Sequence, residues 1–186
     1  LSGFVILGLD NTLALQNQDP TTYANCAWVD PGEEDYDGLV ETLERGARCI
    51  GELSLYHFPA GPSSEGKCYN PSSDFLKKVY QIAEERSIPI IVHFDYTPED
   101  IDKFKLVLSE QESTTFIWAH MGDAPPEVVR GMLQNHSNLL VDISSRNPLC
   151  DYTPRFVGPD EQRLDDGSLR IKPEWKTLFE DYATRV

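Results

Sequence analysis

The chain has 186 residues with 31 acidic and 16 basic side chains, so its formal net charge is −15. This surplus of negative charge opposes binding to phosphate backbones and anionic lipid surfaces, and no nucleic-acid or membrane partner is expected. Hydrophobic residues make up 40% of the chain and aromatic residues 10%, which is enough for a folded core. The sequence contains no apolar run of roughly 20 residues and no basic-then-apolar leader. We therefore expect a soluble globular protein and favour the cytoplasm as its location.

Short apolar runs alternate with amphipathic segments along the chain. The runs that predict strands are residues 4–9, 26–29, 48–53, 88–93, 115–120 and 139–143. The segments that predict helices are residues 34–45, 73–86 and 125–136, one helix capped by Thr97 and one opened by Pro173. Near-continuous apolar strands that alternate with helices indicate a parallel sheet with right-handed crossovers. Long connections at residues 10–25, 54–72 and 144–172 follow the carboxyl ends of strands, where such folds place their binding loops.

The four cysteines are Cys26, Cys49, Cys68 and Cys150, and they include no C-x-x-C pair and no zinc-finger spacing. In a chain of this size they do not indicate a disulfide framework. Their even number leaves a single bridge open, and with it the redox compartment. The chain begins with Leu1 rather than Met, which predicts that processing or truncation has removed a segment.

Ionisable residues end three successive predicted strands. Glu52 follows the third apolar run, His93 ends the fourth and His120 ends the fifth. Because the carboxyl ends of neighbouring parallel strands meet at one edge, we expect these three side chains to point into one cavity. Imidazole and carboxylate groups are good ligands for zinc and similar divalent ions. The pattern therefore predicts a metal or catalytic site.

Other polar residues receive weaker assignments. Asp142, near the end of the next strand, is expected to be a hydrogen-bonded polar residue close to the site. His57 and Arg146, both in long connections, are candidates for contact with substrate, and Arg155 is a further candidate to hold a single carboxylate. His136 is expected to be the cation at the carboxyl end of a helix.

The order of these segments resembles the amidohydrolase superfamily, in particular its amidohydrolase-related metal-dependent hydrolases. The resemblance covers about residues 26–186 and rests on IGEL, IPIIVH, WAHMG and NLLVDIS. It implies a (β/α)8 TIM-type barrel in which His93 is the fifth-strand metal ligand and Glu52 is the fourth-strand carboxylate. It also implies that His120 is the sixth-strand histidine, which binds a second metal or orients and deprotonates the attacking water. The implied cofactor is a divalent ion, with zinc expected.

Two parts of the family pattern are missing from the sequence. No His-x-His pair of the family's first strand is present, and the aspartate of its eighth strand would follow Val186. A barrel of this kind usually needs about 250 residues. We therefore expect residues 1–186 to form a single, truncated barrel domain that contains strands two to seven and an incomplete metal site.

The resemblance implies a hydrolase that acts on a small lactone, ester or amide, with a homo-oligomer left open. Two alternatives remain: a metal-dependent decarboxylase of a small unsaturated or aromatic acid, and a catalytically inactive α/β binding scaffold. A fourth interpretation rests on FVILGLDNTLAL, which resembles the first motif of haloacid-dehalogenase-like phosphatases. That motif needs an aspartate nucleophile where this chain has Gly8, so the phosphatase interpretation is disfavoured.

Overall fold

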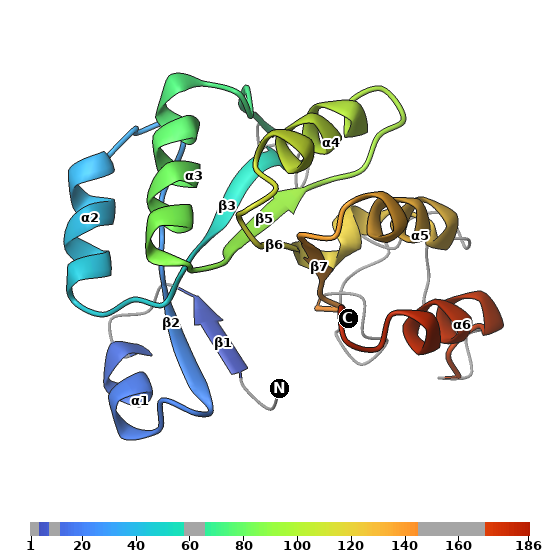
Figure 1. Cartoon of the computed structure of the whole chain (residues 1–186), viewed down its shortest axis with the longest axis horizontal. Coiled ribbons are helices and arrows are strands. Elements are labelled where there is room, and N and C mark those ends of the chain that lie inside the picture. The colour runs from blue at the N-terminus through green and yellow to red at the C-terminus, as the bar shows by residue number, and fades with distance from the viewer. Residues whose placement is uncertain (1–3, 8–11, 58–65, 145–169) are drawn as a thin grey trace.

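The computed structural model describes residues 4–7, 12–57, 66–144 and 170–186. Its sheet contains six parallel strands in the order of the chain. They are β1 (Phe4–Leu7), β2 (Tyr23–Ala27), β3 (Cys49–His57), β5 (Ile90–Phe94), β6 (Phe116–Trp118) and β7 (Leu139–Val141). A two-residue strand, β4 (Lys67–Cys68), pairs antiparallel with the end of β3. Within the described residues the sheet ends at β1 and β7, so the barrel is open, and Figure 1 shows the strands following one another between these ends.

Helices connect the successive strands, as the sequence pattern predicts. They are α1 (Thr12–Gln18), α2 (Tyr36–Glu44), α3 (Asp74–Arg86), α4 (Ile101–Glu110), α5 (Pro126–Asn135) and α6 (Pro173–Asp181), with a 3-10 segment η1 (Ala119–Asp123) after β6. Ser73 caps α3 by accepting a hydrogen bond from the Leu76 amide at 3.2 Å. Thr97 instead caps the turn before α4, since its hydroxyl accepts from the Asp100 amide at 3.0 Å. None of the helices in the described ranges is long and apolar enough to cross a membrane.

The two faces of the sheet differ in what covers them. On one face, strand residues such as Val92 and Phe94 join helix residues such as Val79 and Phe104 in the main hydrophobic core. On the other face a smaller cluster, which we call the apolar layer, consists of Cys26, Cys49, Ile91 and Ala119. We call the face that carries the apolar layer the inner face of the sheet. Side chains alternate along a strand, so the residue two positions after Ile91 on β5 also points to this inner face.

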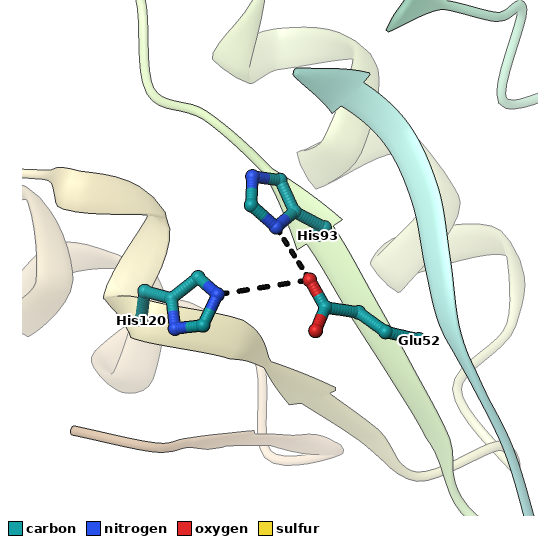
Figure 2. Close-up of side chains that lie close together, drawn as sticks. All are labelled: Glu52, His93 and His120. Carbon is teal, nitrogen blue, oxygen red and sulfur yellow. Dashed lines mark hydrogen bonds and ion pairs between the residues drawn. The ribbon is translucent and has the colours of Figure 1, made fainter. Parts of the chain in front are cut away.

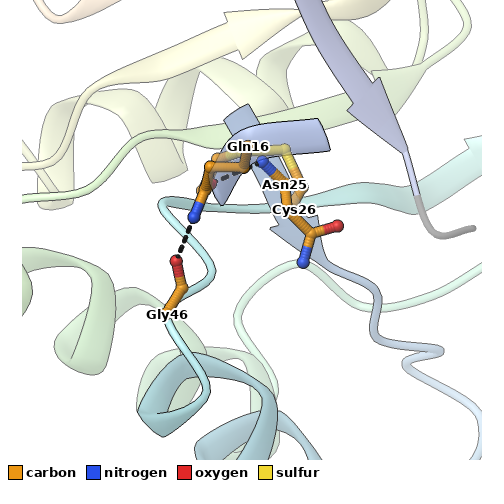
Figure 3. Close-up of a disulfide and its surroundings, with 5 residues drawn as sticks. Gln16, Asn25, Cys26 and Gly46 are labelled. Carbon is orange, nitrogen blue, oxygen red and sulfur yellow. Dashed lines mark hydrogen bonds between the residues drawn. A yellow bond between two sulfur atoms is a disulfide. The ribbon is translucent and has the colours of Figure 1, made fainter. Parts of the chain in front are cut away.

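Two features differ from the sequence predictions. The predicted connection 10–25 contains α1, whose Gln16 side chain accepts from the Asn25 amide and donates to the Gly46 carbonyl, both at 2.8 Å (Figure 3). The third strand does not end near Leu53 but continues to His57, because β4 folds back and pairs with Tyr56 and His57. The polar sequence of the 54–72 connection concealed this hairpin.

Cys26 and Cys49 form a disulfide bond between β2 and β3. The two residues are register partners in the parallel pair, and their Cα atoms lie 4.4 Å apart. Figure 3 shows this bridge beside the Gln16 contacts. Cys68 is exposed and is not disulfide-bonded, whereas Cys150 lies outside the described residues. The described residues therefore contain one buried bridge, which lies in the apolar layer.

Candidate metal centre

Glu52, His93 and His120, which the sequence predicts to end three strands, lie together, and we call them the strand-end cluster (Figure 2). Glu52 comes from β3 and His93 from β5, while His120 comes from η1, directly after β6. Each residue offers one ligand atom, and these atoms all lie within 4.8 Å of one another. The structure thus brings together the three residues that end successive strands in the sequence.

The contacts inside the cluster centre on Glu52. Its Oε1 accepts a hydrogen bond from Nδ1 of His93 and lies 3.6 Å from Nε2 of His120. The rings of His93 and His120 are 5.1 Å apart between centroids and inclined at 73°. All three side chains are largely buried, with exposed fractions of 10% for His93, 17% for His120 and 22% for Glu52. The two imidazoles therefore approach one carboxylate from different directions in a site with little water.

Two glycines let the backbone adopt the conformation that the cluster needs. A Cβ on Gly51, which has φ +136°, would meet the Ile91 carbonyl oxygen at 2.7 Å, so glycine permits the close approach of β3 to β5. A Cβ on Gly122, which has φ +57°, would lie 2.3 Å from the Trp118 indole. Gly122 belongs to a turn in which His120 also has a positive φ of 57°. This left-handed turn takes His120 out of the strand direction and aims its side chain at Glu52.

The ionisable groups of the cluster have pKa values that differ from their ordinary ones. Burial by itself would raise the pKa of Glu52, but the adjacent imidazoles of His120 and His93 outweigh it and lower the pKa from 4.5 to about 2. Burial opposes protonation of His93 as well, yet hydrogen bonds to Asp95 and Glu52 raise its pKa from 6.5 to about 9. The pKa of His120 is also raised against the effect of burial, mainly by Glu52. The negative charge of Glu52 therefore stabilises positive charge within the cluster.

Asp95 is a site residue that the sequence reasoning missed. It is 5% exposed, and its Oδ1 lies 2.9 Å from Nε2 of His93. His57 stacks on the His93 ring, with centroids 4.3 Å apart and an angle of 8°, and its contact with substrate stays a prediction. Together His57, His93 and Asp95 form a second group whose ligand atoms lie within 4.8 Å of one another. The position of Asp95 in the sequence could have indicated its role. It follows His93 by two residues and so shares its face of the sheet.

Residues after β7 hold the backbone and ring of His120. Asp142 accepts a hydrogen bond from the His120 amide at 3.1 Å, in agreement with its predicted place beside the site. Nδ1 of His120 lies 2.8 Å from the Ser144 hydroxyl, and the Ser144 amide donates to Asp142 at 2.8 Å. Ser144 could not be singled out in advance, because a serine just after a strand is common in turns.

Of the remaining candidates the structure describes His136. Arg146 and Arg155, proposed as carboxylate contacts, fall outside the described residues. His136 does end α5, but the prediction that it is the helix-end cation is wrong, since burial and two nearby cations lower its pKa. Arg185 takes that role and donates to the carbonyls of Leu133 and Leu139 at 2.8 Å and 3.0 Å.

Comparison with known proteins establishes the fold. No protein-family model matches the sequence, and no curated protein sequence matches it. A TIM-barrel protein from Bordetella bronchiseptica is 15% identical, with a TM-score of 0.57 over 76% of this chain and 54% of the other. A probable 2-pyrone-4,6-dicarboxylic acid hydrolase from Acinetobacter baumannii, solved with citric acid bound, is 14% identical. Its TM-score is 0.52 over 97% of this chain and 64% of the other.

The chain thus has an incomplete (β/α)8 TIM-type fold and spans less than two thirds of the length of either structure that it resembles. The sequential parallel strand order confirms the fold class expected from the sequence. Which of a barrel's eight strands these six represent stays a prediction, as do the single-domain assignment and the roles of the site residues.

The donor atoms of the strand-end cluster suit a divalent ion. Two imidazole nitrogens and one carboxylate oxygen are ligands that zinc accepts, and catalytic zinc sites often use three protein ligands with a fourth position open. Ligand atoms about 2.0–2.2 Å from one ion lie at most roughly 4 Å apart. The ligand atoms of the cluster lie within 4.8 Å of one another, which is close to this value, so small side-chain rotations would bring the three atoms onto one ion.

Proposed function

We propose that the chain carries the metal site of a hydrolase of the amidohydrolase type, which binds zinc and acts on a small lactone, ester or amide. The observation that carries this proposal is the convergence of Glu52 of β3 with His93 and His120, which lie at the carboxyl ends of β5 and β6. In TIM-type barrels this end of the strands holds the active site. One neighbour in fold is named as a probable 2-pyrone-4,6-dicarboxylic acid hydrolase, which agrees with this class of reaction.

Glu52 and His93 are assigned to hold the ion. Glu52 supplies negative charge in a buried place, and its lowered pKa keeps it ionised at neutral pH. His93 presents Nδ1 to Glu52, the side on which His120 also lies. A bound divalent ion would supply Lewis acidity, by lowering the pKa of a water molecule toward 7 and polarising a carbonyl.

His120 is assigned a direct part in the reaction. Nδ1 of its ring faces the Ser144 hydroxyl and backbone carbonyl, at 2.8 Å and 3.1 Å, so Nε2 faces the cluster. A histidine held in this way can orient a water molecule and accept its proton. The Asp142 contact to its backbone fixes the turn on which the ring is carried.

Metal titration tests the assignment. The purified full chain, stripped with a chelator, is titrated with zinc against a chromophoric competitor, and one equivalent is expected to bind. Glu52→Gln and His93→Gln should each weaken zinc binding by more than about 100-fold, because a direct ligand contributes more than its supporting residues. Glu41→Gln, which changes an exposed glutamate on α2, is the matched control and should bind as the wild type does.

The reaction class is tested on the zinc-loaded protein with small lactones, esters and amides, together with aromatic carboxylic acids. Hydrolysis that is lost in Glu52→Gln supports the proposed function. Release of CO₂ from the acids would favour the decarboxylase alternative, and failure of the wild type to bind zinc would contradict the metal site itself.

A further inference from the structure

We propose that Asp95 and His57 are positioning residues that clamp His93 and so commit its Nδ1 to the strand-end cluster. This inference rests on the proposed metal site and names the residues that decide how that site is built. It starts from the two overlapping groups around His93, one with Glu52 and His120 and the other with His57 and Asp95.

A neutral histidine has one nitrogen lone pair, so His93 can serve only one of these groups at a time. Ring orientation distinguishes the groups, because a metal lies close to the plane of each imidazole that binds it. The planes of His93 and His120 cross at 73°, so they share a line on which one ion can lie. The planes of His57 and His93 are inclined by only 8° with centroids 4.3 Å apart, and such stacked rings do not direct lone pairs at one point.

Asp95 is placed to choose between the two nitrogens. Its Oδ1 lies 2.9 Å from Nε2 of His93, and a carboxylate can only accept a hydrogen bond. Nε2 therefore carries a proton. Nδ1 likewise donates to Glu52 in this structure, and an ion bound by Glu52 would take the place of the Nδ1 proton while Asp95 keeps the proton on Nε2. Carboxylates that bind the second nitrogen of a ligating histidine commonly fix its tautomer and orientation.

The backbone around Asp95 is held at three successive residues. The Phe94 carbonyl accepts from the Trp118 indole at 2.8 Å, and the Asp95 amide donates to the Tyr56 carbonyl at 2.9 Å. The Tyr96 amide donates to Gly122 at 2.7 Å. Asp95 is also 5% exposed, so its carboxylate has little freedom to turn away from His93. His57 covers one face of the same ring and restricts its rotation.

The first experiment uses the metal-free protein with ¹⁵N-labelled histidine. The wild type should show a proton on Nε2 of His93 that exchanges slowly with water. Asp95→Ala should abolish this resonance, whereas the isosteric Asp95→Asn should keep it shifted, since an amide oxygen still accepts a hydrogen bond. Absence of the Nε2 proton in the wild type, or its persistence unchanged in Asp95→Ala, would overturn the inference without involving a metal.

The second experiment uses the protein loaded with ¹¹³Cd. One-bond splitting by cadmium should appear on Nδ1 of His93 in the wild type and should be lost or shared with Nε2 in Asp95→Ala. Zinc affinity should fall by about 10–100-fold in Asp95→Ala, with partial recovery in Asp95→Asn. Splitting on Nε2 in the wild type would overturn the inference and favour the group with His57. A protein that shows the slowly exchanging Nε2 proton but binds no metal would contradict the proposed function alone.

Matched variants separate positioning from general damage. Asp102→Asn makes the same chemical change at an exposed carboxylate on α4 and should leave both spectra and zinc affinity unchanged. His57→Phe keeps a flat ring against His93 and should retain the Nδ1 splitting, whereas His57→Ala should weaken zinc binding. Equal loss of affinity in His57→Phe and His57→Ala would remove His57 from the clamp.

Discussion

The inner face of the sheet contains two regions of opposite character on the same strands. The apolar layer, with the Cys26–Cys49 bridge and Ile91, contains no ionisable group. Two residues farther along β5 the side chain is His93, and the strand-end cluster begins. In TIM-type barrels the carboxyl ends of the strands carry chemistry and the opposite ends carry stability. The difference suggests that damage to the apolar layer should lower stability, while damage to the cluster should change metal binding.

A change in the turn that carries His120 should affect both properties and gives the largest expected effect. Gly122→Ala places a Cβ against the Trp118 indole at a positive φ. Strain and overpacking together should lower the free energy of unfolding by about 4 kcal/mol, and zinc binding should weaken as the turn moves. Urea unfolding and zinc titration measure the two effects.

Gly131→Ala is the control for this substitution. Gly131 lies in α5, and a Cβ there meets nothing within 4 Å. Alanine should stabilise the helix by up to about 1 kcal/mol. If Gly122→Ala proved as stable as Gly131→Ala, the close packing of the turn against Trp118 would be wrong.

Removal of the disulfide should affect stability alone. Cys26 and Cys49 are separated by 23 residues, and a bridge over a loop of this length stabilises a protein by about 3 kcal/mol. The Cys26→Ser/Cys49→Ser double variant should lose about this amount in urea unfolding and keep the zinc affinity of the wild type. Cys68→Ser changes an exposed cysteine without a bridge and should change neither property. A large fall in zinc affinity in the double variant would show that the two regions are coupled.

The smallest of these expected effects is a dependence of the free energy of unfolding on pH. It should arise from the strand-end cluster and not from the apolar layer. In the metal-free protein the lowered pKa of Glu52 stabilises the fold above about 4.5, and this contribution is lost as the pH falls toward 2. The raised pKa of His93 stabilises it below about 6.5, and this contribution is lost as the pH rises through 9.

The contribution of this pair to the free energy of unfolding should therefore be greatest between about pH 4.5 and 6.5 and amount to roughly 2 kcal/mol. Chemical unfolding across this range, with a chelator present, measures it. Glu52→Gln should remove the acidic side of the profile and only reduce the basic side, where Asp95 still raises the pKa of His93. An unchanged profile would contradict the ion pair between Glu52 and His93.

Much of the architecture and part of the cluster could be predicted from local pattern. The near-continuous apolar run before His93 indicates a strand buried on both faces, and the polar residue at its end marks the mouth of the sheet. Alternation along β5 could also have indicated Asp95. The length of β3 could not be predicted, because its last residues form a strand only through pairing with β4.

The sequence by itself determined the order of strands and helices, since apolar periodicity and capping residues act over a few neighbouring positions. It also indicated that ionisable side chains on three successive strands lie close together. Only the tertiary structure decided how His93 is used, because its two nitrogens face different carboxylates and its ring lies across His120 but parallel to His57. Such angles depend on residues 41 and 27 positions apart in the chain, at Glu52, His93 and His120, and no local pattern contains them.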